Sequence, residues 1–257
     1  MTQARTRIAV AGATGRVGRH VVDVLEARGH EVVPIARSRG VDVITGEGLA
    51  DALAGVEAVV DAATGPSADQ AAATEFFTTA SRNLQEAGTR AGVRRIVVVS
   101  IVGADRFSVG YNVAKVAHER AMRSGPIPAF VLRATQFHEF VEQLVRWGTR
   151  GDVAYVQRMR TQLVAARTVA EALADLATNP PPEAEPATGT PEIGGPREES
   201  LVAVAELLVA RRGIPVRVVG VSDPREPNAD LFESGALLPG PGATLAGPTF
   251  EEWLAEG

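Results

Sequence analysis

Two residues form a pair that could carry acid–base chemistry. Tyr111 lies four positions before Lys115, which is the only lysine among the 26 basic residues of the chain. Residues four apart on a helix share one face, and a neighbouring ammonium favours phenolate and moves a phenol pKa of about 10 toward neutral pH. The spacing therefore predicts a proton-transfer site. The alternative is a buried tyrosine beside a lysine whose stem lies along an apolar surface.

A glycine-rich turn near the N-terminus has the spacing of a phosphate-binding loop. Gly12, Gly15 and Gly18 form a Gly-x-x-Gly-x-x-Gly pattern between a predicted strand over Arg7–Ala11 and a predicted helix that ends at Arg28. Such glycines allow a tight turn and a close approach of the backbone to a pyrophosphate, and the helix N-terminus supplies N–H donors. The turn predicts a dinucleotide site, with a ligand-free glycine turn as the alternative.

The residues after the second predicted strand indicate which dinucleotide binds. An NAD site has an acid there for the ribose 2′-hydroxyl, whereas the strand over Glu31–Ala36 is followed by Arg37, Ser38 and Arg39. Guanidinium groups bind a 2′-phosphate bidentately, and Arg16 in the glycine turn can assist. We therefore expect NADP rather than NAD. The alternative is that these are ordinary exposed arginines of an arginine-rich chain.

Strands alternate with helices through the first half of the chain, which predicts a parallel sheet with right-handed crossovers. Further strands are predicted over Val41–Ile44, Val56–Ala62, Arg95–Ser100 and Ala129–Arg133, and helices over Gly48–Ala54, Asp69–Gly92 and Tyr111–Ser124. Later helices are predicted over Gln136–Arg150, Val164–Ala177, Ser200–Arg212 with Ser200 as a cap, and Thr249–Ala255, with a strand over Pro215–Val221 and a loop over Asn179–Pro196. Pro34 conflicts with a central position for its strand, because a central strand needs its N–H groups.

Several segments together resemble the extended and atypical short-chain dehydrogenase/reductases, with the NmrA-like NAD(P)H-binding proteins as the nearest branch. The resemblance covers most of the chain and is most specific from Arg7 to about Gln136. It rests on Ala13-Thr14 within the glycine turn, Arg82-Asn83-Leu84, Val97-Val98-Val99-Ser100, Tyr111-Asn112-Val113-Ala114-Lys115 and Leu132-Arg133-Ala134-Thr135-Gln136. It implies an α/β fold, a Rossmann-type doubly wound parallel sheet with a small C-terminal substrate lobe. The expected division is 1–135 for the core and 136–257 mainly for the lobe, with some segments returning to the core.

The resemblance also implies roles for individual residues. Tyr111 would give a proton to the substrate, Lys115 would lower the Tyr111 pKa and hold the nicotinamide ribose, and Ser100 would lie near the nicotinamide. The residues expected at the cofactor are Gly12, Thr14, Gly15, Arg16, Val17, Gly18, Arg37, Ser38, Ala62, Ala63, Thr64, Ser100, Lys115, Ala134, Thr135 and Gln136. Those expected at the substrate are Val102, Tyr111, Gln136, Phe137 and His138.

Three positions leave alternatives open. The family's catalytic serine or threonine is replaced by Val102, so Ser100 substitutes for it, Tyr111 works without it, or catalysis has been lost. His138 either orients a ligand or is a polar residue of a helix surface. Asp61, unusual in the turn beside the adenosine, is alternatively a hydrogen-bonded structural group.

Composition excludes several classes of function. The 257 residues contain no cysteine, which removes disulfides, thiol catalysis and thiolate metal sites. The net charge of −5 gives little electrostatic support for a nucleic-acid partner. There is no run of 18 apolar residues for a membrane span, no export signal and no histidine spacing for a metal. We expect a cytoplasmic monomer or homodimer that acts on a small molecule.

These features favour an NADP-dependent oxidoreductase that transfers hydride between NADPH and a small organic carbonyl, alkene or imine, with Tyr111 as the acid/base. A non-catalytic NADP-binding sensor or regulator of the NmrA-like type is the first alternative. A nucleotide-sugar epimerase or dehydratase is the second, and fold alone does not decide among the three.

Overall fold

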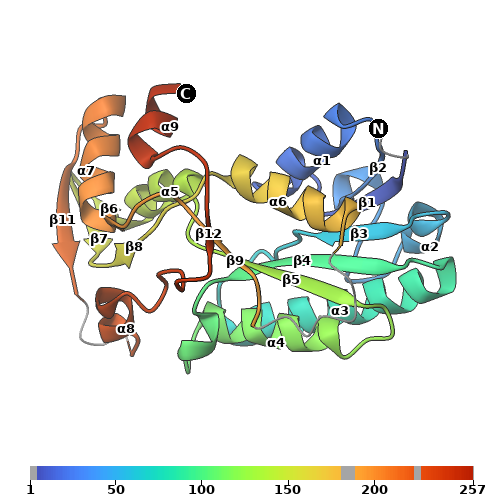
Figure 1. The fold of residues 1–257 in the computed structure, drawn as a ribbon. Coiled ribbons are helices and arrows are strands. Elements are labelled where there is room, and N and C mark those ends of the chain that lie inside the picture. The colour runs from blue at the N-terminus through green and yellow to red at the C-terminus, as the bar shows by residue number, and fades with distance from the viewer. Residues whose placement is uncertain (1–4, 181–188, 223–226, 257) are drawn as a thin grey trace. The chain divides into compact units, whose positions relative to one another are not determined.

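The computed structural model describes residues 5–180, 189–222 and 227–256 (Figure 1). The chain divides into two compact units. Unit 1 comprises Met1–Ser100, Gly110–Leu132 and Val169–Pro191. Unit 2 comprises Ile101–Val109, Arg133–Thr168 and Glu192–Gly257. The chain therefore passes between the units more than once, and each unit is built from segments distant in sequence.

A seven-stranded sheet carries the glycine turn. Its strands are β1 (Arg7–Ala11), β2 (Glu31–Ile35), β3 (Ala58–Asp61), β4 (Arg95–Ile101), β5 (Ala129–Ala134), β9 (Glu192–Gly194) and β12 (Thr244–Leu245). Their order is β12-β9-β5-β4-β3-β1-β2. The registers of β1 with β2 and β3, of β3 with β4, and of β9 with β5 and β12 are parallel. The predicted α/β fold with a parallel, Rossmann-like sheet is confirmed.

Helices lie on both faces of this sheet, as a doubly wound fold requires. They are α1 (Gly18–Ala27), α2 (Leu49–Leu53), α3 (Gln70–Ala91), α4 (Tyr111–Arg123) and α6 (Ala166–Thr178). Figure 1 shows α3 and α4 on one face and α1 and α6 on the other. The central strands of the sheet are the most deeply buried: Ile8, Val10, Val59 and Val97 are fully buried, because parallel strands covered on both faces have no solvent-facing side.

The second unit has its own small sheets and apolar core. Its helices are α5 (His138–Gly148), α7 (Leu201–Arg212), α8 (Ala229–Ser234) and α9 (Phe250–Glu256). Its short strands are β6 (Thr149–Arg150), β7 (Val153–Gln157), β8 (Arg160–Thr161), β10 (Glu199–Ser200) and β11 (Arg217–Val221). Strand β7 pairs parallel with β11 and antiparallel with β6. The hydroxyl of Ser200 accepts a hydrogen bond from the Ala203 N–H, so the predicted cap of α7 is confirmed.

Two expectations about single segments are wrong. The predicted strand over Val41–Ile44 is a turn, because the Asp42 carboxylate accepts a hydrogen bond from the Ile44 N–H and the Asn83 amide donates to the carbonyls of residues 43 and 44. Local side-chain bonds of this kind compete with strand pairing. The predicted loop over Asn179–Pro196 contains β9, which pairs with the end of β5. Its residues 181–188 lie outside the described part.

Pro34 fits its strand because of the strand order. In the order above β2 is the edge strand, and its one neighbour is β1, where Pro34 is the partner of Val10. A proline is accommodated on an edge strand because the missing N–H removes no bond from a second neighbour. The Pro34 anomaly in the sequence therefore follows from the position of β2 at the edge.

In the described part of the chain, no helix has the length and apolar character needed to cross a bilayer.

Candidate functional site

The glycine turn joins β1 to α1 where the strand order reverses. Strand β1 lies between β2 and β3, so the chain turns to one side of β1 for β2 and to the other side for β3. The crevice outside the carboxyl ends of strands at such a switch point is where open α/β sheets bind ligands. Because β1, β3 and β4 are parallel, the residues that follow them share this edge.

The glycines of the turn are required by close contacts. Gly12 has a φ of 72°, and a Cβ there would lie 2.7 Å from the Ala62 carbonyl oxygen and 2.7 Å from the Ala63 Cα. A Cβ at Gly18 would collide with the Gly12 carbonyl. At Gly15, which is exposed, a Cβ would approach protein only at the Gly12 carbonyl oxygen, 3.1 Å away. The first and third glycines thus permit packing within unit 1, and the middle one leaves an open face for a ligand.

The helix that follows the turn is suited to an anion. Helix α1 begins at Gly18, its first turn contains no acidic side chain, and its N-cap Val17 provides no side-chain cap. The positive end of its dipole therefore faces the turn without a competing carboxylate. Thr14 is exposed in the same turn. These features fit the pyrophosphate of a dinucleotide.

Two further strand ends contribute to this edge of unit 1. Ala62 and Ala63 follow β3 and are buried, whereas Thr64 is exposed. Ser100 near the end of β4 is 3% exposed, and its hydroxyl has no hydrogen-bond partner among the described residues. A buried hydroxyl without a partner is costly unless a ligand or water completes it. Ser100 is therefore a second feature that fits a bound cofactor.

The residues after β2 form a short 3-10 helix, Arg37–Arg39, in which all three side chains are exposed. No acidic residue occupies this turn. The arrangement leaves the Arg37 and Arg39 guanidinium groups at the position where an adenosine ribose is read in this type of fold.

Tyr111 begins α4 and packs against α3. Its ring meets the Phe77 ring edge-on, with the centroids 5.8 Å apart. Burial raises the pKa of Tyr111 to about 12. The expectation that Lys115 lowers this pKa is wrong in direction, because the phenol is desolvated and the ammonium is engaged elsewhere.

The Lys115 ammonium lies in the interior of unit 1. Its Nζ donates to the Val99 carbonyl at 2.9 Å, lies 2.8 Å from His118 Nδ1 and stands 4.4 Å from the centroid of the Phe77 ring. Lys115 is 5% exposed, so the alternative of a lysine with its charge in water is also wrong. Burial lowers the pKa of Lys115 to about 8, against the opposing influence of Asp61 and Glu119.

His118 connects this ammonium to Asp61. The His118 Nε2 atom lies 2.9 Å from Asp61 Oδ2, and the other carboxylate oxygen accepts a hydrogen bond from the Ala63 N–H at 3.0 Å. Burial, followed by the charge of Lys115, lowers the pKa of His118. Asp61 is thus the hydrogen-bonded group that the sequence left as an alternative.

Comparison with known proteins places the chain among nucleotide-binding proteins. A family model described as NAD(P)H-binding matches residues 12–180, well over half of the chain. This protein belongs to the NAD(P)H-binding family. The photosystem II assembly factor Ycf39 of a Synechocystis species is 30% identical over an alignment 115 positions long, which covers 39% of this chain and 35% of that protein. The match spans about a third of that relative's length.

Several solved structures have a similar fold, among them a short-chain dehydrogenase/reductase superfamily protein and two nucleotide-sugar enzymes. One is a superfamily member from Agrobacterium tumefaciens with bound NAD, at TM-score 0.66 and 21% identity, covering 97% of this chain and 95% of that one. Another is dTDP-4-dehydrorhamnose reductase from Bacillus anthracis with NADP, at TM-score 0.70 and 17% identity, covering 98% of each chain. UDP-N-acetylglucosamine 4-epimerase from Bacillus cereus matches at TM-score 0.68 and 20% identity, covering 98% of this chain and 94% of that one. At these identities the likeness shows the fold alone.

Six of the expected site residues of this NAD(P)H-binding family member lie in unit 2. They are Val102, Ala134, Thr135, Gln136, Phe137 and His138. The Val102 N–H donates to the Ala134 carbonyl, the Thr135 hydroxyl to the Gln162 carbonyl, and the Thr161 hydroxyl to the Gln136 side chain. Phe137 is half-buried.

His138 has no exposed surface, so its alternative as a helix-surface residue is wrong. Its Nε2 lies 3.1 Å from the Pro248 carbonyl oxygen, and its ring stacks on Trp253 with the centroids 5.4 Å apart. Burial lowers the pKa of His138 to about 4. His138 therefore joins the start of α5 to the C-terminal segment of unit 2.

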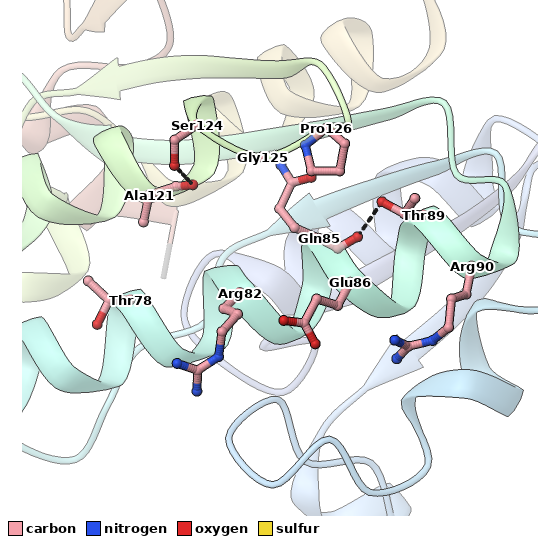
Figure 2. A pocket seen from close by; sticks show the side chains of 10 residues that line it. All are labelled: Thr78, Arg82, Gln85, Glu86, Thr89, Arg90, Ala121, Ser124, Gly125 and Pro126. Carbon is pink, nitrogen blue, oxygen red and sulfur yellow. Dashed lines mark hydrogen bonds between the residues drawn. The ribbon is translucent and has the colours of Figure 1, made fainter.

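A groove of about 530 Å³ lies on unit 1 between α3 and α4. Figure 2 shows its lining, which is Thr78, Arg82, Gln85, Glu86, Thr89, Arg90, Ala121, Ser124, Gly125 and Pro126. Two hydroxyl groups of the groove donate hydrogen bonds to carbonyls, Thr89 to Gln85 within α3 and Ser124 to Ala121 at the C-terminal end of α4. It contains none of the expected cofactor or substrate residues.

Sequence reasoning missed the role of His118. One signal pointed to it: Asp61 ends an apolar strand, and a carboxylate there needs a partner if it is buried. His118 and Lys115 lie three positions apart on one helix face, so the sequence offered both residues as candidate partners of the Asp61 carboxylate. In the part of the chain that the structure describes, no group of three or more histidine, aspartate or glutamate side chains is arranged to bind a metal.

Proposed function

We propose that this protein is an NADPH-dependent reductase of a small organic carbonyl, alkene or imine, with Tyr111 as the proton donor. The observation that supports the proposal is the glycine turn, whose exposed Gly15 and helix start without an acidic side chain fit a dinucleotide. Tyr111, half-buried at the start of α4, carries the phenol for the proton transfer, and a phenol with an ordinary pKa of about 10 is protonated at neutral pH. Reduction of a polar double bond requires a hydride and a proton. When bound, a reduced nicotinamide would supply the hydride. A protonated phenol supplies the proton and later regains one from solvent.

The residues of unit 1 fit the dinucleotide. The exposed face at Gly15 and the start of α1 would hold the pyrophosphate. Gly15 has no Cβ to obstruct the approach of the phosphates, and the positive end of the helix dipole attracts their charge. The buried Ser100 hydroxyl without a partner would hydrogen-bond to the cofactor near the reacting end. Ala62, Ala63 and Thr64 would lie along the adenosine side.

We further propose that NADP is preferred over NAD. Arg37 and Arg39 are exposed directly after β2, in a turn without an acidic residue. A guanidinium binds a 2′-phosphate by charge-assisted hydrogen bonds, whereas selection of NAD relies on a carboxylate at this position.

The substrate is proposed to be a small, mostly apolar molecule, with Gln136 and Phe137 among its contacts, and the protein a monomer or homodimer. The nucleotide-sugar alternative rests on fold likeness alone, and folds of this type serve many reactions.

One observation favours a second function, that of a non-catalytic NADP-binding sensor or regulator. The Lys115 ammonium contacts the Val99 carbonyl, His118 Nδ1 and the Phe77 ring, and the position expected for a catalytic serine is Val102. Two parts of the usual proton-transfer machinery are thus changed while the dinucleotide site is retained.

The two functions differ in turnover. The deciding experiment is NADPH oxidation by the purified protein across a panel of ketones, enones, quinones and imines, after NADPH binding has been measured by fluorescence titration. Turnover of any substrate supports the reductase. Tight NADPH binding with no turnover on the whole panel contradicts it and favours the sensor.

A further inference from the structure

The Lys115 ammonium contacts three groups of unit 1. An ammonium carries three donors and no acceptor. One donates to the Val99 carbonyl oxygen at 2.9 Å, one is directed at His118 Nδ1 at 2.8 Å, and the Phe77 ring face stands 4.4 Å from Nζ. A dinucleotide ribose or the Tyr111 phenol would have to replace one of these contacts.

The donors of Lys115 determine the tautomer of His118. Because Lys115 only donates, His118 Nδ1 must accept, and the ring proton of neutral His118 must then lie on Nε2. That proton points to Asp61 Oδ2, 2.9 Å away. The low pKa of His118, caused by burial and by the Lys115 charge, agrees with a neutral ring. Stacking on Phe77, with the ring planes 14° apart, fixes its orientation.

Asp61 carries this chain of hydrogen bonds to the glycine turn. Its second oxygen accepts the Ala63 N–H at 3.0 Å, and Ala62 and Ala63 are the residues that a Cβ on Gly12 would touch. The Ala62 N–H also donates to the Ala11 carbonyl at the end of β1. A continuous series of contacts therefore runs from α4, through His118 and Asp61, to the turn that lies against the glycine turn.

We propose that Asp61 and His118 are positioning residues of the dinucleotide site, and that Lys115 acts through them rather than as a ligand of the dinucleotide. The proposal concerns dinucleotide binding. It rests on the cofactor part of the proposed function and does not depend on turnover.

The buried charges provide a way to test this proposal. Asp61 and Lys115 compensate each other across His118, and Glu119 beside them is also buried, with Arg123 as its ion-pair partner 3.2 Å away. Removal of one member of a buried pair leaves an uncompensated charge and is strongly destabilising, whereas removal of both is often nearly neutral. A positioning role should therefore be lost in single variants and largely restored when Asp61 and Lys115 are neutralised together.

The experiment compares Asp61→Asn, Lys115→Met and the double variant Asp61→Asn/Lys115→Met. In the double variant, the introduced carboxamide oxygen can still accept the Ala63 N–H, and the carboxamide N–H can donate to His118 Nε2 once the ring proton moves to Nδ1. We expect each single variant to weaken NADPH and NADH binding by about tenfold or more and to lower Tm, because one buried charge loses its partner. The double variant should bind within about threefold of the parent, since no unpaired charge remains.

The double variant decides the matter even where a single variant fails to fold. One result for a folded double variant would overturn the proposal: dinucleotide binding as weak as that of a folded Lys115→Met variant, or more than about tenfold weaker than that of the parent. Lys115 would then contact the dinucleotide directly. Binding is measured without substrate, so a parent that binds NADPH and turns over nothing contradicts the proposed reductase and leaves this test intact.

Two more measurements separate positioning from general stabilisation. Nitrogen-15 NMR of histidine-labelled protein, with His118→Gln for assignment, should show the Nε2–H tautomer in the parent and the Nδ1–H tautomer in the double variant. A charged His118 or an Nδ1–H tautomer in the parent at pH 7 would contradict the proposal.

The matched control is the partly buried ion pair between Glu57 and Arg95, whose closest N···O distance is 3.2 Å. Glu57 directly precedes β3 and Arg95 begins β4, so this pair lies at the strand ends opposite to the dinucleotide site. Arg95→Met should lower Tm and leave NADPH affinity unchanged. An equal loss of affinity in this control would show that binding follows global stability, and would overturn the proposal.

Discussion

The Nε2 atom of His118 lies 2.9 Å from the Oδ2 atom of Asp61, and each of these side chains is 1% exposed. His118 lies on α4 and Asp61 ends β3, and the two residues are 57 positions apart in the sequence. A buried pair of this kind is poorly screened by salt, and it joins the middle of α4 to the end of β3.

The first prediction concerns the proton donor. Tyr111→Phe should reduce kcat on any accepted substrate by about a hundredfold or more, because the general acid is lost. NADPH affinity should stay within about twofold of the parent, since the ring and its contact with Phe77 are retained. Steady-state kinetics and fluorescence titration measure the two effects. An active parent whose Tyr111→Phe variant is equally fast would show that another group supplies the proton.

The second prediction concerns the choice of cofactor. The unmodified protein should bind NADPH more tightly than NADH, and Arg37→Glu should weaken NADPH binding by about tenfold or more with little effect on NADH. The substitution removes a charge-assisted bond and places a carboxylate beside the 2′-phosphate. Arg90→Glu, at an exposed position on α3, makes the same change of charge and should alter neither affinity. Equal binding of the two cofactors by the parent would contradict the prediction.

The third prediction concerns the glycine turn. Gly12→Ala should abolish measurable dinucleotide binding and should destabilise the fold, because its Cβ would overlap the backbone at Ala62 and Ala63. Gly92→Ala is the matched control: Gly92 has a similar φ of 78°, but a Cβ there meets nothing within 4 Å. It should cost only about 1 kcal/mol of left-handed strain, and Gly12→Ala at least about 2 kcal/mol more. Thermal melting and titration measure both, and equal effects of the two substitutions would exclude the contact as the cause.

The fourth prediction concerns pH and His138. The pKa of His138 is about 4 in the folded protein, below the ordinary value of about 6.5, because the ring is buried. The unfolded chain therefore binds the proton first, and stability falls as the pH drops from about 6.5 to about 4. His138→Phe retains the aromatic packing with Trp253 and removes the titrating group, so its Tm should fall less over this range. Parallel pH profiles for parent and variant would show that His138 does not contribute.

The sequence alone determined the features that depend on local physics. Apolar runs broken by glycine predicted β1, β4, α1 and α4 almost to the residue, because side-chain periodicity and turn formation are properties of neighbouring positions. The glycine turn indicated nucleotide binding for the same reason, and the family match over residues 12–180 agrees with it. The spacing of Tyr111 and Lys115 correctly placed both residues on one helix.

Only the tertiary structure decided what those side chains contact. Helical spacing assigns a face and cannot tell what lies opposite it, so the direction of the Lys115 ammonium depended on Asp61 and Phe77, which arrive from other parts of the chain. The sequence also could not predict β9. Its three residues form a strand because they pair with the end of β5, which lies far away in the sequence. A pKa is decided in the same way, since burial raises the pKa of Tyr111 and the sequence spacing gave no measure of that burial. Desolvation and long-range pairing are properties of the folded chain, and no local pattern contains them.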